Sequence, residues 1–126
     1  MTDDLPTVSK RIDRAAIRLY AEISDDFNPI HVDPEFAAAS PMKGIIAHGM
    51  LSLNLIWQVL RNAAGEIQPP VVLDVRFRKP VRENDVVTAG GRRAEDGGYD
   101  VWARNEQGET VIDGTARLAP GSATGP

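Results

Sequence analysis

The chain has 126 residues, 42% hydrophobic and 25% charged, which is the size and composition of one globular domain. Its formal net charge of −4 argues against nucleic-acid binding, which usually requires a basic surface. No cysteine is present, so disulfides, thiolate catalysis and cysteine metal sites are excluded. The N-terminus lacks the basic and apolar regions of a signal peptide, and no apolar stretch is long enough to span a bilayer. We therefore expect a cytoplasmic protein that binds neither nucleic acid nor membrane.

The chain shows no internal repeat and no linker in its middle. Residues 1–118 are expected to form a single domain. Residues 119–126 are small and rich in proline and glycine, without a residue that could join a core, so they are expected to be a disordered tail.

The first part of the chain predicts a short strand over residues 7–12 and then a helix. Asp13 is the expected N-cap of this helix, and apolar side chains recur behind it at helical spacing on one face. The helix is expected to end near residues 24–26. Asn28 and Pro29 follow with a turn signal, because the residue before a proline is pushed away from helical geometry.

Two further helices are predicted before the alternating pattern of strands begins. Asp33 and Pro34 are the expected N-cap and first residue of a short helix that ends before Pro41. Residues 50–64 form the strongest predicted helix, with Gly65 as its C-cap. Apolar side chains cover most of its circumference, which is typical of a helix buried inside a domain.

The second half of the chain alternates apolar and polar residues with a period of two. This pattern predicts four strands, at residues 71–77, 86–94, 99–105 and 110–118. Gly97-Gly98 and Gln107-Gly108 supply hairpin turns between the later strands. The expected fold class is α+β, with a four-stranded meander in an antiparallel sheet wrapped around one central helix. Such a sheet has an exposed edge that strand-to-strand dimerisation would cover.

The candidate chemistry lies between residues 26 and 49. Asn28-Pro29 forces a turn that can bring Asp26 and His31, five residues apart, to the same side of a loop. A carboxylate and an imidazole held together make an acid–base pair, because imidazole titrates near neutrality.

The entry to the long helix offers a second chemical group. The N–H groups of a first helical turn have no partner within the helix, and Gly49 lets a ligand approach them closely. They can bind a carbonyl oxygen that gains negative charge during a reaction. One stretch of sequence therefore offers a base, an acid and an oxyanion donor, which suits chemistry next to a carbonyl.

Two segments resemble a known family. They are YAEISDDFNPIHVDP at residues 20–34 and IAHGM at residues 46–50. Together they resemble the signature of the R-specific enoyl-CoA hydratases, the MaoC-like dehydratases of the hotdog fold. The resemblance implies a hotdog fold and a hydro-lyase that reversibly hydrates trans-2-enoyl thioesters to (R)-3-hydroxyacyl thioesters.

The resemblance also implies residue roles. Asp26 and His31 match the catalytic pair, and Gly49 matches the glycine whose N–H polarises the thioester carbonyl. Further residues expected at the substrate site are Ser24, Asn28, Met50, Leu53 and Trp57. Asp25 departs from the family pattern, which has glycine there; if the position needs a positive φ, aspartate tolerates it at a cost. No metal or other cofactor is expected.

Several residues also have simpler interpretations. Asp26 can be a turn former and His31 a structural histidine. For His48 we favour a structural role, hydrogen bonding that fixes the loop, and for Asp33 an N-cap. A metal site built from His31, Asp33 and His48 has no recognised ligand spacing.

The expected partners are an acyl-CoA or acyl-carrier-protein thioester and a second copy of the chain, in a homodimer or larger homo-oligomer. A basic cluster could meet CoA phosphates or an acidic carrier protein, or could be a solvated strand face; it comprises Arg76, Arg78, Lys79 and Arg82. A hotdog thioesterase is an alternative, although residues 50–64 contain no Asp or Glu. The other alternative is an acyl-binding subunit of a hetero-oligomeric dehydratase.

Overall fold

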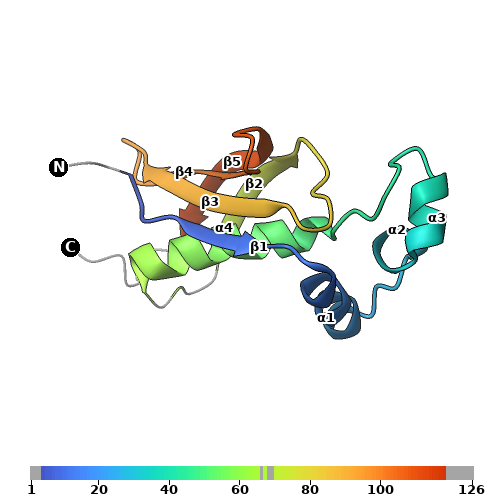
Figure 1. The fold of residues 1–126 in the computed structure, drawn as a ribbon. Coiled ribbons are helices and arrows are strands. Elements are labelled where there is room, and N and C mark those ends of the chain that lie inside the picture. The colour runs from blue at the N-terminus through green and yellow to red at the C-terminus, as the bar shows by residue number, and fades with distance from the viewer. Residues whose placement is uncertain (1–3, 66, 68–69, 119–126) are drawn as a thin grey trace.

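The computed structural model describes residues 4–65, 67 and 70–118. A five-stranded antiparallel sheet packs against the long helix α4 (Gly49–Ala64), and three short helices lie together beyond the N-terminal end of α4 (Figure 1). The expected α+β fold class, an antiparallel sheet with a long helix, is confirmed. The expected tail at 119–126 lies outside the described residues. No helix in the described part of the chain is long and apolar enough to cross a membrane.

The first strand and helix form where the sequence predicts them. β1 (Val8–Arg11) leads into α1 (Arg14–Ser24), and the Asp13 carboxylate accepts a hydrogen bond of 2.8 Å from the Ala16 N–H as N-cap. Asp25 ends α1 in the left-handed conformation, with φ of 56°. The position therefore does have a positive φ in this chain, and aspartate occupies it at the cost expected from sequence.

The expected turn at Asn28-Pro29 continues into a helical turn, α2 (Pro29–Val32). Asn28 caps it by accepting a hydrogen bond of 3.2 Å from the Ile30 N–H, while proline supplies a favourable φ at the first position. α3 (Pro34–Ala39) follows, with Asp33 as the predicted N-cap. The pattern did not predict α2 because four residues are too few to show helical periodicity.

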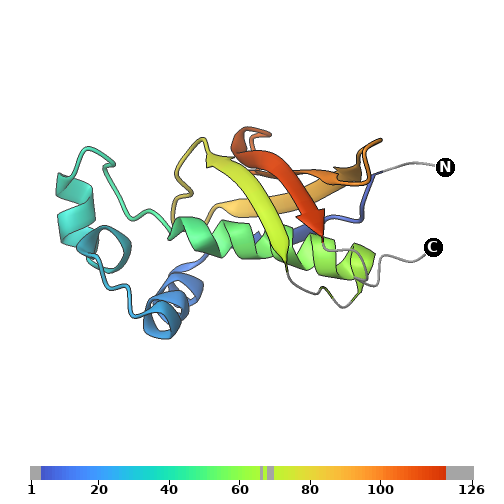
Figure 2. The same ribbon diagram turned by 180° about the vertical axis from the view of Figure 1, so that it is seen from behind.

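Helix α4 is less enclosed than the sequence predicts. Its sheet-facing side is buried, but Met50 is 48% exposed, and Leu53 and Trp57 are only half-buried. The sheet curls over one side of α4 and leaves the other open, as the view from behind shows (Figure 2). The helix ends as predicted at Gly65, whose N–H donates to the Arg61 carbonyl.

The strand positions are predicted well, but their order is not. The strands are β2 (Val71–Phe77), β3 (Val86–Arg93), β4 (Tyr99–Arg104) and β5 (Thr110–Leu118), and the order in the sheet is β1-β3-β4-β5-β2. The predicted four-stranded meander is wrong, since β2 pairs with β5 at one edge and β1 pairs with β3 at the other. The two true hairpins turn at glycines with positive φ, Gly97 and Gly108. Residues 78–85 instead cross the end of the sheet and make a turn just before β3, where the Asp85 N–H donates to the Arg82 carbonyl over 3.0 Å.

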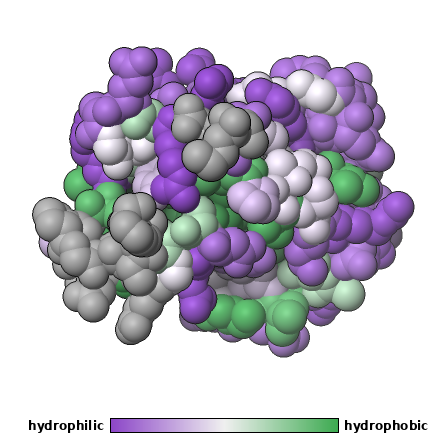
Figure 3. Space-filling model, turned by 90° about the vertical axis from the view of Figure 1, so that its left-hand side faces the viewer, coloured by the Kyte–Doolittle hydropathy of each residue, from purple (hydrophilic) through white to green (hydrophobic). Residues whose placement is uncertain are grey.

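The core lies between the sheet and α4. Its largest fully buried apolar side chains come from the sheet, from α4, and from α1 and the residue before it: Ile12, Ile17, Ile56, Val59, Leu60, Val87, Val101, Val111 and Ile112. The end of the molecule opposite the three short helices has a mainly hydrophilic described surface with apolar side chains between (Figure 3). The short helices and the N-terminus of α4 lie at the other end of the molecule (Figure 1). The candidate chemical groups are at that end.

Candidate active site

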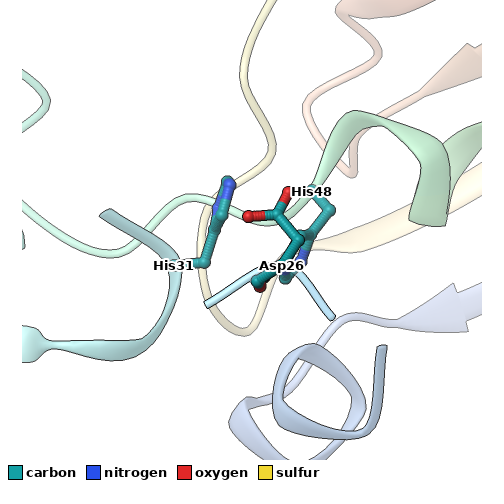
Figure 4. A group of neighbouring side chains, drawn as sticks. All are labelled: Asp26, His31 and His48. Carbon is teal, nitrogen blue, oxygen red and sulfur yellow. The ribbon is translucent and has the colours of Figure 1, made fainter. Parts of the chain in front are cut away.

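The end of α1 sets the position of Asp26. The left-handed Asp25 turns the chain, and the Asp26 N–H donates to the Ala21 carbonyl over 3.1 Å, which closes the helix end. The Asp26 carboxylate then accepts a weak hydrogen bond of 3.3 Å from the Asn28 N–H. This leaves the exposed carboxylate with acceptor positions toward the imidazoles beside it (Figure 4).

His31 lies on α2, and one of its ring nitrogens is already hydrogen-bonded. Its Nδ1 lies 2.7 Å from the carbonyl oxygen of Ile46. Because a carbonyl only accepts, Nδ1 must carry the proton, and in the neutral ring Nε2 keeps its lone pair. His31 therefore presents Nε2 as the nitrogen that can accept a proton.

His48 joins the α1–α2 turn to the start of α4. The side chain is buried, and its Nε2 donates to the backbone carbonyl of Asp26 over 2.9 Å. Its ring stacks on His31 with centroids 3.9 Å apart and planes 25° apart, and the centroid of the Tyr20 ring lies 5.0 Å from it. The expectation that His48 fixes a loop by hydrogen bonding agrees with these contacts.

Asp26, His31 and His48 lie close together, with one potential ligand atom of each within 4.8 Å of the others. Asp33 is not part of this group, since its carboxylate caps α3. The two imidazole planes are nearly parallel, so their in-plane lone pairs run side by side instead of converging on one point. This geometry suits proton transfer better than the tetrahedral ligation of a transition metal.

A cavity of about 300 Å³ opens beside the two histidines. Gly49 is the first residue of α4 and lines this cavity, so its N–H has no partner within the helix and lies at the positive end of the dipole. A Cβ at Gly49 would lie 2.8 Å from Phe77 Cε2, so glycine permits the ring to approach the helix start. The other lining residues include Ser52, Val81, Val111 and Ile112.

The remaining predicted substrate residues lie elsewhere. Ser24 donates its hydroxyl to the Tyr20 carbonyl, and Asn28 uses its side-chain oxygen to cap α2. Trp57 lines a separate hollow at the C-terminal end of α4. Met50 and Leu53 are not among the residues that line the 300 Å³ cavity. Within the described chain, the structure thus gathers His31, His48 and Gly49 at the cavity and Asp26 beside them.

The sequence pattern does not identify Ser52 and Phe77, which line the cavity. Phe77 comes from β2, and only the correct strand order brings the end of that strand to the start of α4. Ser52 is a polar residue in the most apolar helix of the chain, and that contrast is the signal that could have identified it.

Most of the basic cluster is already paired. Arg78 contacts Asp113 over 2.9 Å, and Arg82 donates to the Met42 carbonyl over 2.6 Å. Lys79 contacts Glu109, and its hydrogen bond holds the pKa of that carboxyl below its ordinary value. Arg78 and Lys79 also line the cavity, but their carboxylate partners favour the interpretation as a solvated strand face.

The fold resembles that of hotdog-fold hydratases. The R-hydratase PhaJ1 from Pseudomonas aeruginosa superimposes with a TM-score of 0.81 at 27% identity, covering 94% of this chain and 79% of that one. The (R)-hydratase from Aeromonas caviae gives 0.79 at 29% identity, covering 94% and 96%. These similarities confirm the hotdog fold.

The model of the MaoC-like domain matches residues 3–114, and the chain belongs to this family. It is 37% identical over 83 residues to the (R)-specific enoyl-CoA hydratase of Aeromonas caviae, covering 65% of this chain and 62% of that protein. It is 41% identical over 101 residues to 3-hydroxyacyl-thioester dehydratase X of Mycobacterium tuberculosis, covering 79% and 34%. The matched segments therefore span less than two thirds of these relatives.

Proposed function

We propose that this chain is a hydro-lyase that reversibly hydrates trans-2-enoyl thioesters to (R)-3-hydroxyacyl thioesters. The observation that carries the proposal is that His31 and Gly49 line one cavity while the Asp26 carboxylate lies beside the two histidines. The names of the relatives, enoyl-CoA hydratase and 3-hydroxyacyl-thioester dehydratase, support this choice of reaction.

The thioester carbonyl binds at the Gly49 N–H, where the helix dipole stabilises the enolate that forms. Asp26 and His31 Nε2 hold a water molecule as acceptors of its hydrogens. Its oxygen forms a bond to C3 while one of its protons passes to the pair, and a proton from the pair is delivered to C2. Elimination is the same path reversed. The R configuration is carried over from the relatives.

The thioesterase alternative has less support. Many thioesterases of this fold place a catalytic carboxylate on or beside the central helix, and α4 has no Asp or Glu between Gly49 and Ala64. The carboxylate beside the cavity instead belongs to the turn after α1, next to an imidazole, where it can manage the protons of an addition to a double bond.

The partners of the proposed enzyme are a CoA or carrier-protein thioester and a second hotdog chain. A similar structure, the ChsH1–ChsH2 complex from Mycobacterium tuberculosis, pairs two different chains and has a TM-score of 0.76 at 25% identity. Because this chain carries the whole acid–base group, a homodimer is the assembly we propose. A cytoplasmic location remains the expectation from sequence.

Substitution of the pair tests the proposal. Asp26→Asn and His31→Ala should each lower crotonyl-CoA hydration at least about 100-fold, because each removes a proton acceptor. Asp26 is exposed, so Asp26→Asn should change thermal unfolding little, whereas His31→Ala also loses the hydrogen bond to the Ile46 carbonyl and should cost about 1 kcal/mol while remaining folded. Asp25→Asn is the matched control, since it neutralises the adjacent carboxylate and should retain activity. Near wild-type turnover in either pair variant would refute the mechanism.

A further inference from the structure

Two buried polar atoms beside the cavity have no hydrogen-bond partner in the described chain, His48 Nδ1 and Ser52 Oγ. Both residues line the cavity, and His48 is 4% and Ser52 2% exposed. A buried hydroxyl or ring nitrogen without a partner is unfavourable, and such groups are rare in folded proteins. These two atoms therefore require an explanation that the proposed reaction steps do not supply.

The two atoms are chemically complementary. His48 Nε2 donates to the Asp26 carbonyl, so in the neutral ring Nδ1 is a pure acceptor. The Ser52 hydroxyl can donate a hydrogen bond. Rotation about the Cα–Cβ bond gives its oxygen three staggered positions.

Their places on the helix also match. Ser52 follows the N-cap His48 by four residues, which is one helical turn. Side chains in a helix lean toward its N-terminus, so Ser52 leans over the turn that His48 opens. A serine in this place often donates to the carbonyl four residues earlier, but here its oxygen makes no such bond.

We propose that Ser52 is a positioning residue that, after rotation about its Cα–Cβ bond, donates its hydroxyl to His48 Nδ1. The bond fixes the tautomer in which His48 Nε2 donates to the Asp26 carbonyl, and so holds the main chain that carries the Asp26 carboxylate. It also occupies the one lone pair by which His48 could compete with the stacked His31 for a proton. In this role Ser52 acts through His48.

The bond can be tested by nitrogen NMR of the full chain, independently of activity. The chain has two histidines, so a ¹⁵N-histidine-labelled sample gives two ring systems, which His31→Ala assigns. We expect His48 to be protonated at Nε2, with an Nδ1 resonance that moves toward the free lone-pair position in Ser52→Ala. An Nδ1 resonance identical in the wild type and Ser52→Ala, or a His48 protonated at Nδ1, would overturn the proposal.

The kinetic consequence rests on the proposed function. Losing one neutral hydrogen bond in Ser52→Ala should lower kcat for crotonyl-CoA hydration roughly five- to tenfold with KM unchanged. Ser52→Thr and Ser52→Val have the same shape, so threonine should restore both kcat and the Nδ1 resonance while valine should not. Ser9→Ala, an exposed hydroxyl on β1, is the matched control.

The two proposals fail in different ways. A wild-type protein that does not hydrate enoyl thioesters, yet shows the Nδ1 change, overturns the proposed function and supports the Ser52–His48 bond. An active wild type whose kcat is unchanged in Ser52→Ala overturns the positioning role. Equal activity of the threonine and valine variants would likewise show that the hydroxyl does not act.

Discussion

At the scale of single residues, the direction of the chain after α1 depends on Asp25. Its φ of 56° costs an L-residue energy that glycine would not incur. Asp25→Gly should therefore raise the free energy of unfolding by about 0.5 to 1 kcal/mol, after allowing for the greater freedom of glycine in the unfolded chain. Urea denaturation measures this change. A destabilised variant would mean that the Asp25 side chain makes a contribution larger than its backbone strain.

Local residue roles were predictable because they depend on near neighbours. Asp13 and Asp33 cap the helices that directly follow them, and the positive φ at Asp25 follows from its place after a helix end. The pairing of Asp26 with His31 was likewise expected from the turn between them. The hydrogen bond from His48 to Asp26 spans 22 residues, and no local pattern specifies which carbonyl a distant imidazole will reach.

At the scale of elements, the pairing of β2 with β5 depends on a glycine. A Cβ at Gly114 would lie 2.0 Å from the Asp74 carbonyl oxygen and 2.6 Å from Val75 Cα, and backbone cannot swing aside as a side chain can. Gly114→Ala should therefore destabilise the protein by about 3 kcal/mol or more.

Thermal unfolding of Gly114→Ala tests this pairing, with Gly108→Ala as a comparison. Gly108 has a positive φ, but a Cβ added there would meet nothing within 4 Å, so the cost of alanine should be limited to backbone strain. Equal melting temperatures for the two variants would contradict the close approach of β2 to β5.

The position of each strand followed from the sequence, whereas the order of the strands did not. Alternating side chains define where β2 lies and which of its faces is buried, but the same pattern permits pairing with β3 or with β5. Gly97-Gly98 and Gln107-Gly108 define the true hairpins by their turn residues. The end of β2 lies at the start of α4 only in the observed order, which is why Phe77 could not be predicted at the site.

At the scale of the whole molecule, β2 is an edge strand with one side unpaired in the described chain. Val72 is 58% and Phe77 54% exposed along this strand, and an edge strand of this kind is a template for pairing with another chain. We expect self-association through β2, which would give sedimentation at twice the 13.7 kDa chain mass.

A charge on this edge tests the assembly. Val72→Lys should shift the protein toward the monomer, because pairing would bring two like charges together between the strands. Ser9→Lys places the same charge on β1, the opposite edge, and should leave the mass unchanged. A monomeric wild type, or a monomer produced by both variants, would contradict self-association through β2.

The central claim is that Asp26, His31 and Gly49 add water across the double bond of an enoyl thioester. Incubating the purified protein with crotonyl-CoA and separating the products on a chiral column tests this most directly. The expected product is 3-hydroxybutyryl-CoA of the R configuration, with the thioester intact and no free thiol. Release of free CoA without hydration, or formation of the S product, would contradict it.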